Sequence, residues 1–330
     1  MGEELKAADI TIGVVGLGLM GSSIVVSLLL AGHEVVAIEP VAGERDVAST
    51  RIHQQLKRYE KLGMLNAPRE RYLSMLTVSD DYGPLRRCEL VLECVIEKMD
   101  IKDAVYQKIA SASSPDTIIA TNTSAIPISI LQELVCFPDR FIGIHWSEPA
   151  FATRFLEITC GRETSQATAD RAFAVALLWG KEPTVLRKDI RGFITNRLMY
   201  AIYREAFALV ERGTATMEDI DRSFRYDEGS WMTLMGVFRR IDFMGLDDCH
   251  AIFSAVFPLL DNSDRMPAVM EQLLKDASGG LGAVARLHTY APGEVEKWKE
   301  AFARFTRDIN ELAGQYSSSV RGDNRMLSML

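Results

Sequence analysis

The sequence has no long apolar run. Its longest apolar stretch, residues 24–31 (IVVSLLLA), is far shorter than the roughly 20 residues that a helix needs to cross a bilayer. The opening residues, MGEELKAAD, are acidic where a secretory signal is basic, and Lys6 departs from the myristoylation pattern that a Met-Gly start requires. We therefore expect no membrane span, no signal peptide and no lipid anchor.

Cysteine is scarce, and an excess of positive charge is lacking. The five cysteines are odd in number and contain no C-x-x-C, which argues against a disulfide framework and against a zinc site. They are Cys88, Cys94, Cys136, Cys160 and Cys249. The net charge is −8, so neither nucleic acid nor an anionic membrane is an expected partner. We expect a cytoplasmic protein with reduced thiols and no metal.

Short apolar runs alternate along the chain with longer helical patterns. Apolar and β-branched runs predict strands at residues 10–15, 34–40, 76–79, 90–95, 117–122, 141–146, 154–160 and 182–188. Helical patterns fill most of the intervals, as in residues 20–32 and 99–113. Such alternation predicts an α/β fold with a doubly wound sheet.

The pattern changes near residue 190. Residues 191–213 form a long amphipathic pattern with no strand after it, and Thr216 with Asp219 matches a capping box for the next helix. The remainder is typical of helices and loops. We therefore predict two domains, residues 1–190 with the sheet and residues 191–330 with helices only.

Three glycines follow the first predicted strand in a G-x-G-x-x-G pattern, Gly16, Gly18 and Gly21. A strand precedes them and a helix follows, which is the context of a Rossmann-like dinucleotide site rather than of an ordinary glycine turn. The first glycine permits the tight turn, the second lets a pyrophosphate approach, and the third lets helix and strand pack. The free N–H groups at the helix start, at Leu19 and Met20, would face the phosphates.

An acidic residue, Glu39, ends the second predicted strand. A carboxylate at this position accepts hydrogen bonds from the adenosine ribose hydroxyls and repels a 2′-phosphate. No arginine follows before Arg45. The sequence therefore predicts NAD rather than NADP as the cofactor.

A histidine and a glutamate are the candidates for acid–base chemistry. His145 ends one predicted strand, and Glu157 lies in the next, twelve residues later. A hairpin-like return would bring the two together at the carboxyl edge of the sheet, where doubly wound folds bind ligands. The carboxylate would then fix the tautomer of the imidazole, whose other nitrogen can take a proton from an alcohol. The alternative is a core histidine and an unrelated, solvent-facing carboxylate.

Taken with three further motifs, these residues resemble the NAD-dependent 3-hydroxyacyl-CoA dehydrogenases and their relatives that act on free 3-hydroxy acids. VLECVIEKMDIK resembles the family stretch that places Glu97 and Lys102 at the cofactor. ATNTSAIPI places Ser124, and IRGFITNRL places Asn196, on active-site positions of the family. The resemblance implies hydride transfer, a role in fatty acid metabolism, and a homodimer formed through the helical domains.

Two departures from the family pattern concern the substrate. The family has asparagine before the proline that follows the histidine, and this chain has Glu148. Arg154 would either neutralise Glu148 or bind a substrate carboxylate. The basic residues with which the family holds the phosphates of CoA have no clear counterpart in the segment 45–71. A polar free 3-hydroxy acid, as in dehydrogenases of the gulonate or carnitine type, is therefore the alternative substrate.

Two other classes of protein remain as rivals. β-Hydroxyacid dehydrogenases related to phosphogluconate dehydrogenase share GLGLMG, but the lysine of their Gly-x-Gly-x-x-x-Lys helix has no counterpart in this sequence. A non-catalytic, crystallin-like relative would keep the fold without turnover. The presence of both His145 and Glu157 argues against that second rival.

Overall fold

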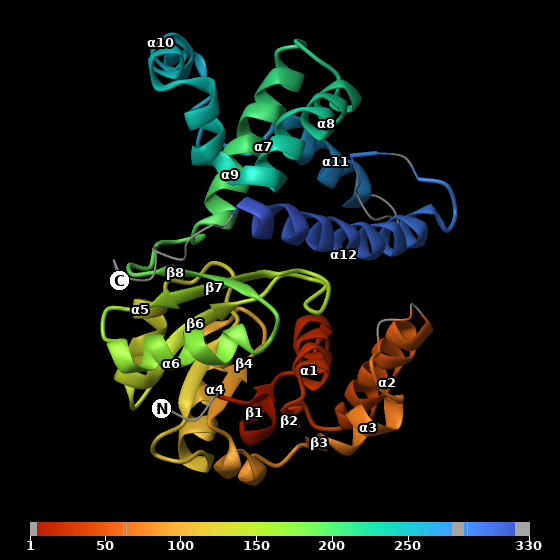
Figure 1. Ribbon diagram of the computed structural model, residues 1–330, viewed down its shortest axis with the longest axis vertical. Coiled ribbons are helices and arrows are strands. Elements are labelled where there is room, and N and C mark those ends of the chain that lie inside the picture. Colours follow the sequence, from red (N-terminus) through yellow and green to blue (C-terminus); the bar gives the residue numbers. More distant parts are fainter. Residues whose placement is uncertain (1–4, 62, 64, 279–286, 289, 321–330) are drawn as a thin grey trace. The chain divides into compact units, whose positions relative to one another are not determined.

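The computed structural model describes residues 5–61, 63, 65–278, 287, 288 and 290–320. The chain forms two compact units, Met1–Asn196 and Arg197–Leu330. Figure 1 shows the sheet in the first unit, from red to light green along the chain, and the helices of the second unit, from green to blue.

The first unit is built around one sheet of eight strands in the order β3-β2-β1-β4-β5-β6-β7-β8. The strands are β1 (Thr11–Val15), β2 (Glu34–Ile38), β3 (Leu76–Ser79), β4 (Leu90–Glu93), β5 (Ile118–Thr121), β6 (Phe141–His145), β7 (Phe155–Cys160) and β8 (Glu182–Leu186). The first six are parallel to one another, β7 runs antiparallel to β6, and β8 pairs parallel with β7. The predicted doubly wound sheet is confirmed, with most strands one or two residues shorter than predicted.

Helices cover both faces of this sheet (Figure 1). They are α1 (Leu19–Ala31), α2 (Arg45–Lys61), α3 (Arg69–Ser74), α4 (Met99–Ala112), α5 (Ile128–Leu131) and α6 (Gln166–Leu177), with short 3₁₀ turns at Ala7–Asp9, Gly83–Arg87, Gln132–Leu134 and Pro138–Arg140. Buried residues of α1, α2 and α6 pack on one face, and buried residues of α4 and α5 pack on the other.

The alternation of side chains along β1 explains the two layers. Ile12 and Val14 belong to the core under α1 and α2, whereas Val15 belongs to the core under α4. Successive side chains of a strand point to opposite faces, so a strand covered on both sides must be apolar throughout. The helix α1 ends at Ala31, and its C-cap Gly32, with a positive φ of 97°, closes the last turn.

The second unit is helical, which confirms the predicted class of the C-terminal region. It contains α7 (Thr195–Glu211), which begins two residues before the unit does, α8 (Met217–Tyr226), α9 (Glu228–Met244), α10 (Leu246–Val256), a 3₁₀ turn at Phe257–Leu259, α11 (Ala268–Ser278) and α12 (Glu294–Val320). The hydroxyl of Thr216 accepts the N–H of Asp219 at 3.1 Å, so the predicted cap of α8 is confirmed. In the part of the chain that the structure describes, no helix has the length and apolarity to cross a membrane.

Candidate active site

In the glycine turn between β1 and α1, two glycines are closely packed and a third has open space beside it. A Cβ atom on Gly21 would lie 1.9 Å from the carbonyl oxygen of Gly16, and one on Gly16 would lie 2.8 Å from Val95 Cγ1. A Cβ atom on Gly18 would meet nothing within 4 Å among the described residues. Gly18 is also the residue before Leu19, where α1 begins. The turn thus leaves space beside the N–H groups of a helix start, which fits a pyrophosphate.

The side chain of Glu39 forms a hydrogen bond with the backbone of this turn. Its side chain is buried, and its carboxylate accepts the N–H of Leu17 at 3.0 Å and the N–H of Val41 at 3.1 Å. From α2, the guanidinium of Arg51 donates to the carbonyl oxygen of Leu17. The sequence gives no signal for this contact, because Arg51 lies 34 residues from Leu17. The turn therefore receives both an anionic and a cationic side chain.

His145 and Glu157 face each other across the antiparallel pair β6–β7. Nδ1 of His145 lies 2.9 Å from Oε2 of Glu157, and the two side chains are only 10% and 1% exposed. Phe155 and Phe193 pack against the imidazole, with ring centroids at 5.5 and 5.8 Å. Nε2 has no hydrogen-bond partner among the described residues, so it is available to another group.

The second oxygen of Glu157 is bound by the start of α7. Oε1 accepts the N–H groups of Ile194 at 3.1 Å and Thr195 at 2.9 Å, just after Phe193, whose φ is +49°. Burial alone would raise the pKa of Glu157, but the hydrogen bonds from His145 and from these N–H groups outweigh it and lower the pKa. Glu157 is therefore held as an anion.

Ser124 and Asn196 come from distant parts of the first unit and meet. Nδ2 of Asn196 donates to the carbonyl oxygen of Ser124 at 2.9 Å. The loop that carries Ser124 also contacts the end of β6, because Oδ1 of Asn122 accepts the N–H of Trp146 at 2.9 Å. Since Asn196 lies in the first turn of α7, the same helix start contacts both the Ser124 turn and Glu157.

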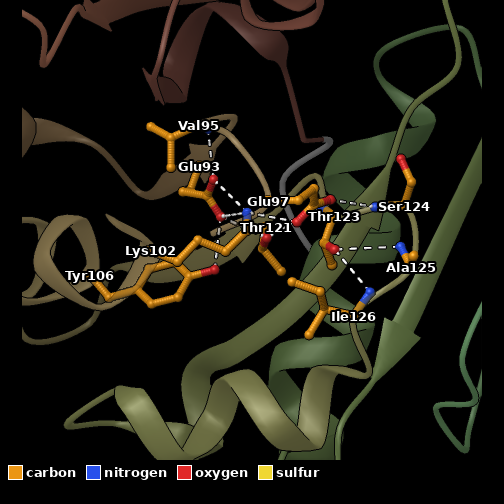
Figure 2. A network of polar contacts seen from close by, with 10 residues as sticks. All are labelled: Glu93, Val95, Glu97, Lys102, Tyr106, Thr121, Thr123, Ser124, Ala125 and Ile126. Carbon is orange, nitrogen blue, oxygen red and sulfur yellow. Dashed lines mark hydrogen bonds and ion pairs between the residues drawn. The ribbon is translucent and has the colours of Figure 1, made fainter. Parts of the chain in front are cut away.

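Glu97 and Lys102 lie beside the Ser124 turn in different environments (Figure 2). Glu97 is exposed and accepts the N–H of Ser124 at 3.0 Å. Lys102 is 1% exposed, and its ammonium lies 2.9 Å from both carboxylate oxygens of Glu93. Glu93 is a further residue of this site, and its only signal in the sequence is a carboxylate at the end of an otherwise apolar strand.

Glu148 and Arg154 do not pair with each other. Nη2 of Arg154 lies 2.6 Å from Oε1 of Glu182, and both side chains are exposed. Partial burial raises the pKa of Glu148, and the hydroxyl of Ser23 and the charge of Arg58 oppose that shift. Glu148 therefore interacts with α1 and α2, while Arg154 interacts with the edge strand β8.

Two family profiles cover most of the chain. The profile "3-hydroxyacyl-CoA dehydrogenase, NAD binding domain" matches residues 11–190, and "3-hydroxyacyl-CoA dehydrogenase, C-terminal domain" matches residues 192–290. The chain is 30% identical, over 89% of its length and 94% of the relative, to 5-formyl-3-hydroxy-2-methylpyridine 4-carboxylate 5-dehydrogenase of Mesorhizobium japonicum. It is 30% identical, over 82% of its length and 95% of the relative, to the probable 3-hydroxybutyryl-CoA dehydrogenase of Deinococcus radiodurans.

The fold is shared with solved dehydrogenases. The crystal structure of a 5-formyl-3-hydroxy-2-methylpyridine 4-carboxylic acid 5-dehydrogenase, an NAD⁺-dependent dismutase, matches 92% of this chain and 98% of that one, with a TM-score of 0.83 and 28% identity. The N-terminal match is to an NAD-binding domain, and both named relatives are dehydrogenases. The chain therefore belongs to the NAD-dependent 3-hydroxyacyl-CoA dehydrogenase family, which includes relatives that act on free acids.

Proposed function

We propose that His145 is the acid–base group of a reversible dehydrogenation at a carbon that bears a 3-hydroxyl. The observation that carries this proposal is the buried contact between His145 and Glu157, with Nε2 directed away from the pair. NAD, when bound, supplies the hydride acceptor. Nε2 takes the hydroxyl proton in oxidation and returns it in reduction, while Glu157 keeps the Nδ1–H tautomer and stabilises the imidazolium.

Ser124 and Asn196 complete the proposed site. Their contact at 2.9 Å places a hydroxyl and an amide on neighbouring elements, and both groups can donate hydrogen bonds. We assign them to the reacting oxygen or to the neighbouring carbonyl of the substrate. Donors fixed before the reaction stabilise charge that develops on oxygen, which is their contribution to the rate.

We assign the cofactor to the glycine turn. The N–H groups at the start of α1 and the open space at Gly18 support pyrophosphate binding there, and we assign Glu39 to the adenosine ribose. The assigned residues are Gly16, Gly18, Leu19, Met20, Gly21, Glu39, Glu97 and Lys102. Lys102 contributes through other residues in this assignment, because its ammonium is buried against Glu93. The first domain, to about residue 190, thus binds NAD, and the helical domain serves the substrate and the dimer.

For the substrate we favour a 3-hydroxyacyl-CoA. A groove of about 500 Å³ lies between α2 and α3, and its lining includes the cationic side chains of Lys57 and Arg69. The lining residues are Ser49, Thr50, His53, Gln54, Lys57, Arg69 and Leu73. Cations and hydroxyls are the groups that bind phosphates, so the groove supports recognition of the nucleotide end of CoA. A free hydroxy carboxylic acid is the second candidate, favoured by the similarity to the pyridine carboxylate dehydrogenase.

The test is a comparison of substrates with and without the nucleotide part of CoA. We expect turnover of 3-hydroxybutyryl-CoA, and Lys57→Ala should raise its KM about fivefold, the worth of one exposed ion pair. The KM of the corresponding pantetheine thioester should not change. Lys61→Ala, on the same helix but outside the groove lining, is the matched control.

The same assay also measures free 3-hydroxy acids as substrates, and it includes the variant Glu148→Asn. Efficient turnover of a free acid with none of the CoA ester would replace the first candidate by the second. In that case Glu148 and Arg154, on the loop between β6 and β7, are the proposed specificity residues. No turnover with either substrate class would refute the proposed reaction.

We also propose a homodimer formed through the helical unit. Among the residues of that unit whose side chains are described, only Ala208, Cys249 and Thr306 are buried. Large apolar side chains are exposed instead, such as Phe238 at 83% and Leu259 at 74%. Exposure of this many large apolar side chains supports an association surface on the helical unit. Sedimentation at micromolar concentration should give twice the chain mass, and a monomer would contradict the assignment.

The five cysteines are all free thiols in the structure. Free thiols are typical of a reducing compartment, which supports a cytoplasmic location. Cell fractionation with an antibody against the chain would test it.

A further inference from the structure

A buried ion pair lies behind the proposed active site, at the carboxyl end of β4 (Figure 2). Glu93, the last residue of β4, is 0% exposed and receives hydrogen bonds on both carboxylate oxygens. The donors are Lys102 Nζ at 2.9 Å to each oxygen, the N–H of Val95 at 2.7 Å, Tyr106 Oη at 2.8 Å and Thr121 Oγ1 at 2.7 Å. A carboxylate with this many donors is fixed in position.

Lys102 connects Glu93 with Glu97, which contacts the Ser124 turn. Its Nζ lies 3.3 Å from Oε2 of Glu97, and Oε1 of Glu97 accepts the N–H of Ser124 at 3.0 Å. The carbonyl oxygen of Ser124 in turn accepts Nδ2 of Asn196 at 2.9 Å. Figure 2 shows the ammonium of Lys102 between the two carboxylates. A continuous set of contacts therefore joins the core of the sheet to two proposed active-site residues.

The geometry points to Glu93, Lys102 and Glu97 as positioning residues, which hold the Ser124 turn in the orientation that the reaction needs. This inference rests on the proposed roles of Ser124 and Asn196. Lys102 orients Glu97, and Glu97 fixes the peptide N–H of Ser124. The hydroxyl of Ser124 and the amide of Asn196 are thereby held in one orientation toward the substrate. Lys102 contacts neither substrate nor cofactor in this arrangement, because its side chain is buried on all sides.

The charges explain why an ion pair serves this purpose. Glu93 neutralises Lys102 inside the protein, so the ammonium is retained at a buried position where a lone cation would be costly. The side chain of Glu97 is exposed, and its ion pair with this fixed ammonium restricts the rotamers that it would otherwise sample in solvent. Placement errors of about 1 Å in catalytic groups cost up to about a hundredfold in rate, so such a device affects turnover more than binding.

The test removes the ion pair as a unit. Single removal of Lys102 would leave a buried anion unpaired, so the informative variant is the double substitution Glu93→Gln/Lys102→Met. We expect kcat to fall about tenfold or more, and to fall by a larger factor than the Kd of NAD rises. Tyr106→Phe is the matched control: it removes one hydrogen bond to Glu93, leaves the contact of Lys102 with Glu97, and should keep kcat within about threefold.

A second readout does not depend on turnover. Hydrogen exchange of the Ser124 amide should be faster in Glu97→Gln and in the double variant than in the unmodified protein, and unchanged in Tyr106→Phe. In a Ser124→Ala background the double variant should lose most of its effect on kcat. Unchanged exchange, additive effects on kcat, or a rise in the Kd of NAD that matches the loss of rate would overturn the inference.

The outcomes separate this inference from the proposed function. If Ser124→Ala and Asn196→Ala turn over normally, the assignment of those two residues is wrong. If both lose activity while the double variant keeps normal kcat and normal exchange, only the positioning role is refuted.

Discussion

His145→Gln is expected to lower kcat about 10²–10⁴-fold, the usual contribution of a positioned acid–base group. Glutamine keeps a polar side chain of similar reach, but its amide does not take up the hydroxyl proton. NAD binding should survive, because the glycine turn assigned to NAD lies between β1 and α1 and not beside β6. The measurement is steady-state turnover across pH together with a fluorescence titration of NADH. His250→Gln, at an exposed position of α10, is the control.

Glu157→Gln tests the other half of the pair. Turnover should fall and its pH profile should move, because the imidazolium loses its counter-charge. The pKa of Glu157 in the folded protein is lowered from 4.5, so its ionised form stabilises the fold above pH 4.5, and that stabilisation is lost as the pH falls through the folded pKa. The stability difference between the two proteins should therefore shrink in acid. Normal turnover of His145→Gln at every pH would remove the mechanism.

The second large effect is a contrast between two neighbouring glycines. Gly21→Ala places Cβ 1.9 Å from the carbonyl oxygen of Gly16, so backbone must move, and overpacking of this kind costs about 1–3 kcal/mol or more. Gly18→Ala meets no atom within 4 Å among the described residues, and its stability should stay within about 0.5 kcal/mol. Its methyl group instead fills the space assigned to the pyrophosphate.

We therefore expect Gly18→Ala to unfold at the normal denaturant midpoint but to bind NAD more weakly by about tenfold or more, since 1.4 kcal/mol is already a factor of ten. Gly21→Ala should lose both stability and binding. Denaturant titrations and calorimetric binding of NAD measure the two effects separately. Normal NAD affinity of Gly18→Ala would show that the pyrophosphate lies elsewhere.

The sheet could be predicted because its physics is local. Strands buried on both faces must be nearly all apolar, and β-branched runs bounded by polar residues mark their positions within one or two residues. The antiparallel direction of β7 is also predictable from the sequence, since a short Pro-containing loop leaves no room for a crossover helix between residues 145 and 155. Lengths of strands were overestimated where a run continues into the loop, as after Glu93.

The polar contacts of the site could not be predicted in the same way. Arg154 is paired with Glu182, a residue 28 positions away, rather than with Glu148. Lys102 is buried although lysine is seldom buried without a partner, and that partner, Glu93, is visible only once β4 and α4 are placed together. Such pairings depend on side-chain directions and on distances between elements, and the order of residues along one chain contains neither.

The hydrogen bonds from Ile194 and Thr195 to Glu157 bear on how this protein can be divided and recombined. A gene fragment that stops at residue 190 would encode every strand of the sheet, yet it would leave one oxygen of a buried carboxylate without its two donors. A chimera that joins this sheet to the helices of another relative should therefore cross over after Asn196. With that choice, the proposed acid–base pair is inherited intact, and any change in substrate preference is attributable to the helices alone.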